Sequence, residues 1–291
     1  MKRLKDILYK VSVSAVHGNT DVIIHGVHFD SRQIQENDVF VAQKGGVVDG
    51  HQFIEKTISL GAKTIICEEF PLSLEDDVTY VKVEDSNVAL AIMSANFYNN
   101  PSRELQLVGI TGTNGKTTIA TLLYQLFKKA GYKVGLLSTV KIMIDETEYE
   151  ATHTTPNSLM INKYLSLMIE EGVEYCFMEV SSHGIHQKRT EGLSFVGGVF
   201  TNLSHDHLDY HETFAEYRDV KKSFFDSLPK SAFALVNIDD KNGQIMLQNT
   251  KANKKSYALK TLGDYKAYVF EKRFSGTLLA VNGVEVWTTL I

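Results

Sequence analysis

A glycine-rich turn between a predicted strand and a predicted helix constrains this chain more than any other feature. The apolar segment 105–110 predicts a strand, and a helical pattern begins at Lys116. A turn of this kind lets backbone N–H groups and the positive end of the helix cradle a phosphate. We therefore expect a phosphate-binding loop formed by consecutive residues: Gly112, Thr113, Asn114, Gly115, Lys116, Thr117 and Thr118.

The residue types in this loop suggest a nucleotide site. Lys116 is expected to reach the terminal phosphates, and the Thr117 hydroxyl is expected to bind Mg²⁺. Strict Walker spacing places a glycine at position 110, where this chain has Ile110. The alternative is an ordinary strand–turn–helix junction that binds no ligand.

The rest of the chain predicts an α/β fold in two domains. After residue 100, strands alternate regularly with helices, which favours a mostly parallel, doubly wound sheet. Shorter strands and helices fill residues 1–100, and a break at residues 99–102 predicts a boundary there. We expect a small N-terminal α/β domain over 1–100 and a phosphate-loop domain over 101–291. Ligands in such sheets bind at the carboxyl ends of the strands.

Composition excludes several classes of function. A formal net charge of −5 argues against broad nucleic-acid binding. Cys67 and Cys176 stand in apolar runs, which predicts buried thiols and not a disulfide or metal site. No apolar stretch reaches membrane-spanning length, and the N-terminus lacks a signal-peptide pattern. We expect a cytoplasmic protein with no membrane partner.

Two strand ends carry further polar residues. Glu179 ends a predicted strand among apolar neighbours, where an unpaired carboxylate is costly, so it is either a Mg²⁺ ligand or a salt-bridged strand residue. The next strand leads into 205–211, which contains three histidines and two aspartates. This composition is typical of metal or phosphate chemistry, and its spacing also permits zinc, although a merely polar loop is the alternative.

A lysine breaks the pattern of the following helix. Thr213 and Glu216 form a capping box that predicts a helix start. Lys221 falls on the apolar stripe of that helix, whereas Lys222 is expected on its solvated polar face. An inward-pointing lysine is either a desolvated amine open to modification or a side chain whose stem covers apolar surface.

Together these motifs resemble the Mur ligases, ATP-dependent amide-forming enzymes of peptidoglycan synthesis. The phosphate loop carries the resemblance, together with Asn202-Leu203, Asp206-His207-Leu208-Asp209 and a lysine four residues after Tyr217. Further features narrow it to the branch that adds the third peptide residue: Asp30-Ser31-Arg32, His153-Thr154-Thr155-Pro156, and Glu179-Val180-Ser181-Ser182-His183-Gly184 with Gln187 and Arg189.

The resemblance implies three domains, which hold the UDP end of the substrate, ATP and the incoming amino acid. This chain resembles the first domain and most of the second. The ATP domain is therefore expected to be C-terminally truncated and the amino-acid domain absent. The choice between meso-diaminopimelate and L-lysine stays open, because the absent domain makes it. A monomer is expected.

The resemblance also implies roles for the site residues. Lys116, His207 and Lys221 would be catalytic. Thr117 and Glu179 would hold one Mg²⁺, and His207 and Lys221 a second, with Lys221 carboxylated by CO₂ to a carbamate. Ser31 would bind the uridine end. The muramoyl-dipeptide would be bound by the remaining polar residues: Thr154, Thr155, Ser182, Gln187 and Arg189.

The implied reaction transfers the γ-phosphate of ATP to the free carboxylate of UDP-MurNAc-L-Ala-D-Glu, and a diamino acid then attacks the acyl phosphate. Two other interpretations remain. A folylpolyglutamate synthetase would share the phosphate loop and the carbamate, but Asp30-Ser31-Arg32 and the Gln187/Arg189 pair argue against it. A nucleotide-binding fragment without turnover is the non-enzymatic alternative.

Overall fold

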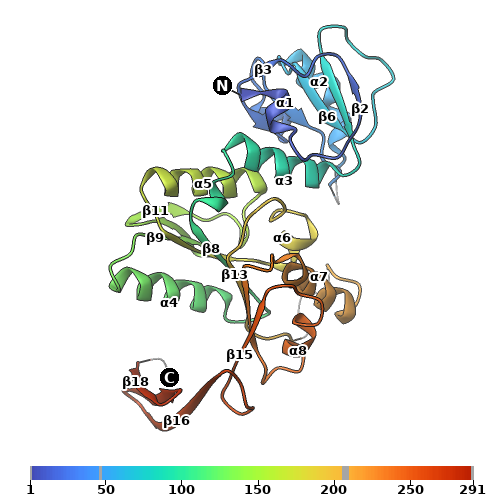
Figure 1. The fold of residues 1–291 in the computed structure, drawn as a ribbon. Coiled ribbons are helices and arrows are strands. Elements are labelled where there is room, and N and C mark those ends of the chain that lie inside the picture. Colours follow the sequence, from blue (N-terminus) through green and yellow to red (C-terminus); the bar gives the residue numbers. More distant parts are fainter. Residues whose placement is uncertain (1, 46–47, 205–209, 290–291) are drawn as a thin grey trace. The chain divides into compact units, whose positions relative to one another are not determined.

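The computed structural model describes residues 2–45, 48–204 and 210–289 and divides into two compact units (Figure 1). Unit 1 comprises Met1–Leu105, Thr155–Gly172 and His186–Ser194. Unit 2 comprises Gln106–Thr154, Val173–Ile185 and Phe195–Ile291. The boundary expected at residue 100 lies close to the first junction. Two later segments that the sequence assigned to the second domain nevertheless pack with unit 1.

Unit 1 is built on a five-stranded sheet in which β7, β6, β5 and β4 are parallel and β2 is antiparallel. In spatial order the strands are β2 (Val13–His17), β7 (Thr79–Val83), β6 (Thr64–Cys67), β5 (Val39–Val41) and β4 (Val27–His28). A separate ribbon pairs β1 (Lys2–Arg3) with β3 (Ile23–Ile24). The helical elements are α1 (Leu4–Ile7), η1 (Ser31–Gln33), η2 (Gly50–Phe53), α2 (Ile54–Ser59), α3 (Ser86–Phe97), η3 (Pro101–Arg103) and α5 (Ser158–Glu170).

Both faces of this sheet are buried, because successive strand residues point to opposite sides. Val39 and Val41 join one cluster with α1 and α3, whereas Phe40 joins a second cluster with α2. Continuous apolar strands of this kind are typical of parallel sheets covered by helices.

Unit 2 contains an eleven-stranded sheet that is parallel from β9 to β16 and antiparallel at both ends. In spatial order the strands are β11 (Thr147–Glu150), β10 (Lys141–Ile144), β9 (Val134–Leu137), β12 (Tyr175–Glu179), β8 (Gln106–Thr111), β13 (Gly197–Phe200), β14 (Phe233–Asn237), β15 (Asn253–Ala258), β16 (Tyr265–Arg273), β17 (Gly276–Val281) and β18 (Val284–Thr288). Its helices are α4 (Lys116–Lys129), α6 (Ser182–His186), α7 (Phe214–Ser227) and α8 (Gly243–Met246). The predicted mostly parallel α/β fold is confirmed.

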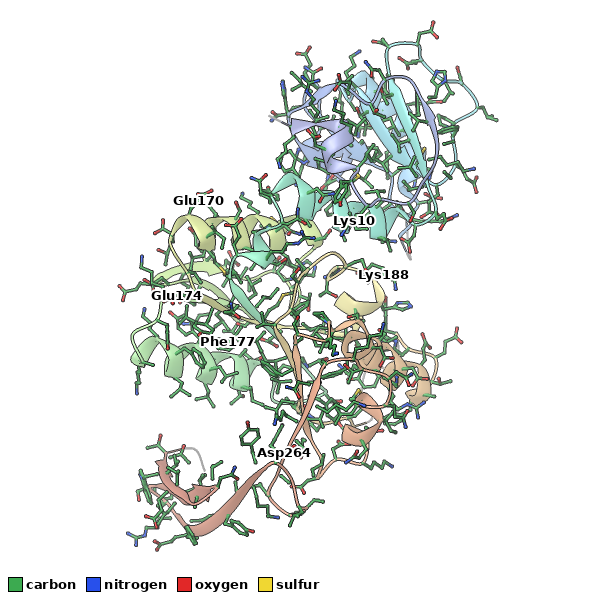
Figure 2. All side chains as sticks on the ribbon, viewed as in Figure 1. Lys10, Glu170, Glu174, Phe177, Lys188 and Asp264 are labelled. Atoms are coloured by element: carbon green, nitrogen blue, oxygen red, sulfur yellow. The ribbon has the colours of Figure 1, made fainter. Side chains whose placement is uncertain are left out.

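Helices α4 and α7 pack on opposite faces of the central strands. Val108 and Ile110 of β8 join the cluster beneath α4, which also contains Phe177 (Figure 2). Gly109 points the other way, where an added Cβ would lie 2.5 Å from the ring of Phe224 on α7. Gly198 of β13 also leaves room for the Phe224 ring, since an added Cβ at Gly198 would lie 2.8 Å from it. Two glycines therefore let α7 approach the sheet closely.

The C-terminal hairpin turns at an Asn-Gly pair. Asn282 and Gly283 have φ values of 49° and 86°, as the turn between β17 and β18 requires. The helical period of the apolar residues in α4 does not by itself locate the buried face of this helix. Leu122 and Leu126 fit its helical period, but they are 37% and 61% exposed. The buried stripe is centred on Ala120 and Tyr124, so it lies further round the helix.

Both cysteines are free and buried, as the sequence predicts. Burial raises the pKa of the Cys67 thiol to about 12 and also raises the pKa of Cys176. The apolar surroundings disfavour a thiolate, which makes both thiols unreactive in the folded protein. Within the described part of the chain, the helices are too short or too polar to cross a bilayer.

We predict that Gly109→Ala destabilises unit 2 by about 1–3 kcal/mol, because the new methyl group overpacks the contact with Phe224. Thermal unfolding measures the loss. Gly263→Ala is a matched control, since its Cβ would meet neighbours only at 3.4 Å and its φ is not in the left-handed region. Adding Phe224→Leu to Gly109→Ala should cost less than the sum of the two changes; simple additivity would contradict this packing argument.

Candidate active site

The phosphate loop follows β8 and continues into the first turn of α4. Gly112 has a φ of 146°, and a Cβ there would lie 1.9 Å from the Thr201 hydroxyl oxygen. Gly115 is the N-cap residue of α4 with a φ of 85°, although an added Cβ would meet nothing within 4 Å. The lack of space therefore requires a glycine at position 112. The left-handed backbone conformation favours a glycine at position 115.

The end of β13 braces this loop from the neighbouring strand. The Thr113 amide donates to the Asn202 carbonyl oxygen at 2.8 Å, and the Asn114 amide donates to the Asn202 side-chain oxygen at 3.0 Å. The Thr201 hydroxyl in turn donates to the Asn114 carbonyl oxygen at 2.6 Å. Asn202 belongs to a motif that the sequence singled out, but only the structure shows that it shapes the loop.

The packing of Ile110 explains why this position holds an isoleucine in place of the glycine of the strict Walker spacing. Ile110 is the penultimate residue of β8, is fully buried and belongs to the cluster beneath α4. A glycine at this position would remove buried apolar surface without widening the turn, which begins two residues later.

Two lysines converge on one carbonyl group of the loop. The Lys116 ammonium donates to the carbonyl oxygens of Gly112 at 3.1 Å and Thr113 at 2.8 Å. The Lys221 ammonium, carried on α7, donates to the same Gly112 oxygen at 3.0 Å. Two cations therefore lie at one edge of the loop, which is suited to a strongly anionic ligand.

Lys221 points inward, as the sequence predicts. It is 1% exposed, and its ammonium lies 4.8 Å from the centroid of the Tyr217 ring. The Tyr217 hydroxyl lies 3.1 Å from the Thr113 hydroxyl. Residues four apart share a helix face, so Tyr217 and Lys221 contact the phosphate loop together.

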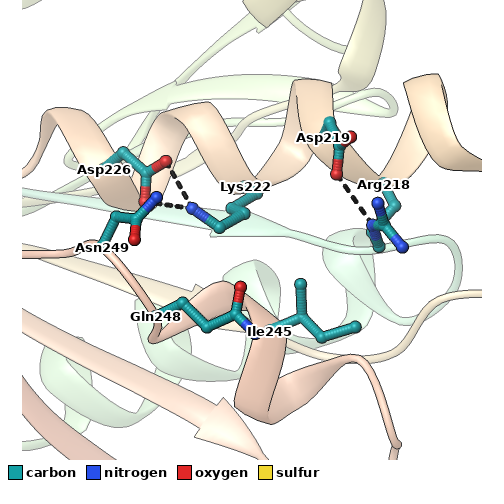
Figure 3. A pocket seen from close by; sticks show the side chains of 7 residues that line it. All are labelled: Arg218, Asp219, Lys222, Asp226, Ile245, Gln248 and Asn249. Atoms are coloured by element: carbon teal, nitrogen blue, oxygen red, sulfur yellow. Dashed lines mark hydrogen bonds and ion pairs between the residues drawn. The ribbon is translucent and has the colours of Figure 1, made fainter.

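The prediction for Lys222 was wrong. It is only 9% exposed, and its ammonium lies 2.9 and 2.6 Å from the two carboxylate oxygens of Asp226 (Figure 3). The polar face of α7 is not fully solvated, because residues in and after α8 lie opposite it. Together they line a pocket of about 400 Å³: Arg218, Asp219, Lys222, Asp226, Ile245, Gln248 and Asn249.

Glu179 lies at the end of β12 beside the loop and is fully buried. Its carboxylate accepts hydrogen bonds from the Thr117 hydroxyl at 3.0 Å and the Thr139 amide at 2.8 Å. The Thr139 hydroxyl donates to that carboxylate at 3.2 Å and lies 3.1 Å from the Thr154 hydroxyl. Sequence reasoning missed Thr139, whose signal was its position just beyond strand β9.

These oxygen atoms are suited to a magnesium ion. A carboxylate and a hydroxyl 3.0 Å apart are hard ligands of the type that Mg²⁺ takes beside nucleotide phosphates. Among residues 2–45, 48–204 and 210–289, no group of three or more His, Cys, Asp or Glu side chains is arranged to hold a metal. His207, Asp206 and Asp209 lie outside the described residues, so the zinc interpretation of their loop does as well.

The predicted substrate residues fall in both units. In unit 1, the Arg189 guanidinium donates to the Thr155 carbonyl oxygen at 2.6 Å and to the Gln187 side-chain oxygen at 3.0 and 2.6 Å. In unit 2, Thr154 joins the Glu179 network described above. The Ser182 hydroxyl is buried, with no hydrogen-bond partner in the described part of the chain.

Ser31 lies in η1, directly after β4. Asp30 caps this turn by accepting from the Arg32 amide, and its carboxylate pairs with the Arg32 guanidinium at 2.7 Å. These contacts lower the pKa of Asp30 to about 2. The Asp-Ser-Arg triplet therefore forms a locally braced turn at the carboxyl edge of the unit 1 sheet.

Comparison with known proteins identifies the family. The profile of the Mur ligase middle domain matches residues 110–288, and that of the Mur ligase family catalytic domain matches residues 23–98. The chain belongs to the Mur ligase family. Each profile match spans most of the sheet of one unit.

The curated relatives of this Mur ligase chain are longer than it is. It is 51% identical over 284 residues to UDP-N-acetylmuramoyl-L-alanyl-D-glutamate--2,6-diaminopimelate ligase of Phocaeicola vulgatus, covering 98% of this chain and 59% of the relative. It is 40% identical to the ligase of the same name in Clostridium tetani, covering 91% of this chain and 54% of the relative. The chain thus spans less than two thirds of the length of these relatives.

Solved structures share the fold. One structure of a UDP-N-acetylmuramoyl-L-alanyl-D-glutamate--2,6-diaminopimelate ligase superposes with a TM-score of 0.82 at 23% identity, covering 98% of this chain and 59% of that one. MurF ligase from Thermotoga maritima, in complex with ADP, superposes with a TM-score of 0.59 at 22% identity. This match covers 90% of this chain and 57% of that one. At these identities the likeness shows the fold alone.

We predict that Lys116→Met weakens binding of Mg²⁺–ATP by about tenfold or more, because charge-assisted hydrogen bonds to phosphate are lost. The fold should persist, since the Gly112 carbonyl keeps its bond to Lys221. Calorimetric titration and thermal unfolding measure the two effects. Lys129→Met, at the exposed far end of the same helix, is the control. Unfolding of the Lys116 variant with ATP affinity retained would contradict this role.

Proposed function

We propose that this chain carries the UDP-substrate and ATP sites of a ligase that adds diaminopimelate to UDP-N-acetylmuramoyl-L-alanyl-D-glutamate. The observation that carries the proposal is the phosphate loop with two lysines on one carbonyl oxygen, beside the Thr117–Glu179 pair. The name of the relative that is 51% identical supports diaminopimelate over L-lysine. Because the chain spans 59% of that relative, the complete reaction is proposed for the longer protein.

ATP is the proposed nucleotide. The ADP complex of the Thermotoga maritima MurF ligase supports this choice, as does the braced loop of this chain. Thr117 and Glu179 would hold one Mg²⁺, which supplies charge neutralisation at the phosphates. Lys116 would direct its ammonium to the terminal phosphates, where charge develops during transfer.

The proposed reaction has two steps. The γ-phosphate passes to the free carboxylate of the dipeptide, giving ADP and an acyl phosphate. The amine of the diamino acid then attacks the acyl carbon, an amide bond forms and inorganic phosphate leaves. Positioning and electrostatic stabilisation are the main contributions of a protein to such chemistry.

The buried amine of Lys221 is the proposed site of carbamylation. Its neutral form would attack CO₂, forming an N–C bond and releasing a proton. The carbamate keeps one N–H, which could still donate to the Gly112 carbonyl oxygen, and gains anionic oxygens. A buried cation would thus become a hard ligand for a second Mg²⁺, shared with His207.

The remaining residues are assigned to substrate. Ser31 would bind the uridine end, and the dipeptide would be held by the other polar residues: Thr154, Thr155, Ser182, Gln187 and Arg189. Free, buried cysteines are typical of a reducing compartment, which supports the cytoplasm as the site of the reaction. A monomer remains our prediction.

Two alternatives are less favoured. A folylpolyglutamate synthetase would not need the Asp30-Ser31-Arg32 turn of unit 1, and the relatives named above act on a UDP-muramoyl substrate. Binding of uridine nucleotide against folate tests this choice. A nucleotide-binding fragment without turnover remains an outcome of the binding experiment below.

We predict that Lys221, and not Lys222, carries a carbamate. Incubation with ¹³C-labelled bicarbonate should give a carbamate signal in the ¹³C NMR spectrum of the chain without substitutions. Lys221→Arg should abolish the signal, because a guanidinium does not react with CO₂. Lys222→Arg should keep it, since arginine preserves the pair with Asp226. A signal that survives Lys221→Arg would overturn the assignment.

We predict that the 291-residue chain binds UDP-N-acetylmuramoyl-L-alanyl-D-glutamate without forming the tripeptide. The proposed uridine and dipeptide residues are present, whereas the chain spans only 59% of the relative that is 51% identical to it. Calorimetric titration measures binding of the UDP-dipeptide. A product assay with ATP and diaminopimelate measures tripeptide formation. Tripeptide formation at a full enzymatic rate would show that the chain holds all three sites.

A further inference from the structure

A hydroxyl group at the end of β8 is buried without a hydrogen bond. It belongs to Thr111, the last residue of the strand, which is 0% exposed. The backbone carbonyl of Thr111 accepts from the Thr201 amide at 3.0 Å, but its side-chain oxygen has no partner among residues 2–45, 48–204 and 210–289. Burying a polar group without a partner costs free energy, so this hydroxyl requires an explanation.

The hydroxyl lies on the face of the sheet that α7 covers. Thr111 is the Cα partner of Phe200 in the parallel pair of β8 and β13, and such partners point to one face. The Phe200 ring meets the Phe225 ring of α7 edge-on, with the two centroids 6.5 Å apart. Gly109, two residues before Thr111, points to the same face, where an added Cβ would lie 2.5 Å from Phe224 of α7. Strand alternation and cross-strand pairing therefore agree.

The position of Thr111 along α7 follows from the contacts on either side of it. Phe224 lies over Gly109. Three residues earlier in the helix, and hence on the same helix face, the Lys221 ammonium donates to the Gly112 carbonyl oxygen at 3.0 Å. Thr111 stands between Gly109 and Gly112 in the chain, so its side chain falls between the contacts of Phe224 and Lys221. The hydroxyl and the ammonium group are thus buried under neighbouring turns of one helix.

The chemistry of the two groups suggests what the hydroxyl is for. A hydroxyl has one hydrogen to donate, whereas an ammonium group offers no lone pair to accept it. The unmodified Lys221 therefore cannot satisfy the donor of Thr111. A carbamate on the same nitrogen would bring two anionic oxygens, which only accept hydrogen bonds.

We propose that Thr111 is a positioning residue for the carbamate on Lys221, to which its hydroxyl donates a hydrogen bond. The inference rests on the proposed carbamylation. The Lys221 ammonium first releases a proton. Its nitrogen then bonds to the carbon of CO₂, and a second proton leaves as the carbamate forms. The Thr111 hydroxyl keeps its own hydrogen and directs it to one carbamate oxygen, which leaves other lone pairs for the proposed second Mg²⁺.

The hydroxyl would have opposite effects in the two forms of the protein. Without CO₂ it is a buried donor for which the described part of the chain offers no acceptor. With the carbamate present it donates to a charged oxygen in buried surroundings, where such hydrogen bonds are strong. Loss of the hydroxyl should therefore weaken the affinity for CO₂ and leave the unmodified protein no less stable.

Thr111→Val tests this inference, because it removes the hydroxyl and keeps the branched shape of the side chain. The carbamate signal in the ¹³C NMR spectrum, followed against bicarbonate concentration at constant pH, measures the CO₂ affinity of the full chain. We expect Thr111→Val to need about tenfold more bicarbonate for half occupancy, because a hydrogen bond to a charged oxygen is lost. Thr111→Ser keeps the donor and should restore the wild-type dependence.

Thermal unfolding in CO₂-free buffer gives a measurement that does not depend on the carbamate. The unfolding temperature of Thr111→Val should equal or exceed that of the wild type. Thr79→Val is a matched control, because Thr79 is also a buried strand residue but its hydroxyl donates to the Asn19 carbonyl oxygen at 2.9 Å. This control should lower the unfolding temperature and leave the bicarbonate dependence unchanged.

Two results would overturn the inference. One is an unchanged bicarbonate dependence in Thr111→Val. The other is a lower unfolding temperature of that variant without CO₂, which would show that an internal water or another group already pairs with the hydroxyl. Absence of a carbamate signal from the wild-type chain at every bicarbonate concentration would instead refute the proposed carbamylation, and this inference with it.

Discussion

The carbonyl oxygen of Gly112 is the point on which the active site depends. It accepts from Lys116, which belongs to the loop, and from Lys221, which belongs to a helix more than a hundred residues later. Two ammonium groups on one oxygen repel each other unless anions surround them or one charge is removed. The phosphates of the proposed nucleotide would supply the anions, and a carbamate on Lys221 would remove one of the two positive charges. Both features of the proposed chemistry would add negative charge beside these two lysines.

This arrangement requires close approach of the parts that carry it. Gly109 and Gly198 let α7 lie against β8 and β13, and Gly112 leaves space for Thr201. A larger side chain at these positions would move Lys221 relative to the loop by about the width of a methyl group, which is enough to weaken hydrogen bonds. Gly109 and Gly198, which lie in strands outside the phosphate loop, therefore help to determine the geometry at that loop.

Short-range patterns predicted much of this site. The loop, the strand-end position of Glu179 and the inward direction of Lys221 follow from glycine placement, strand ends and helical period. Features made by distant segments could not be predicted in this way. Thr139 contacts Glu179 because β9 and β12 are neighbours, and Lys222 is covered because α8 returns beside α7. The strands β10, β11, β15 and β16 carried too weak a pattern to be recognised.

The composition of unit 1 has a consequence for how the protein is made. Its sheet is complete by residue 83, but α3 packs against α5, and Arg189 bonds to Thr155 within the same unit. Residues up to 105 leave the ribosome well before these partners, while β8, α4 and β9 of unit 2 emerge in between. Domains usually fold in the order of synthesis. Here unit 1 must wait for segments that are translated after β8 and β9, the first strands of the other sheet's parallel core.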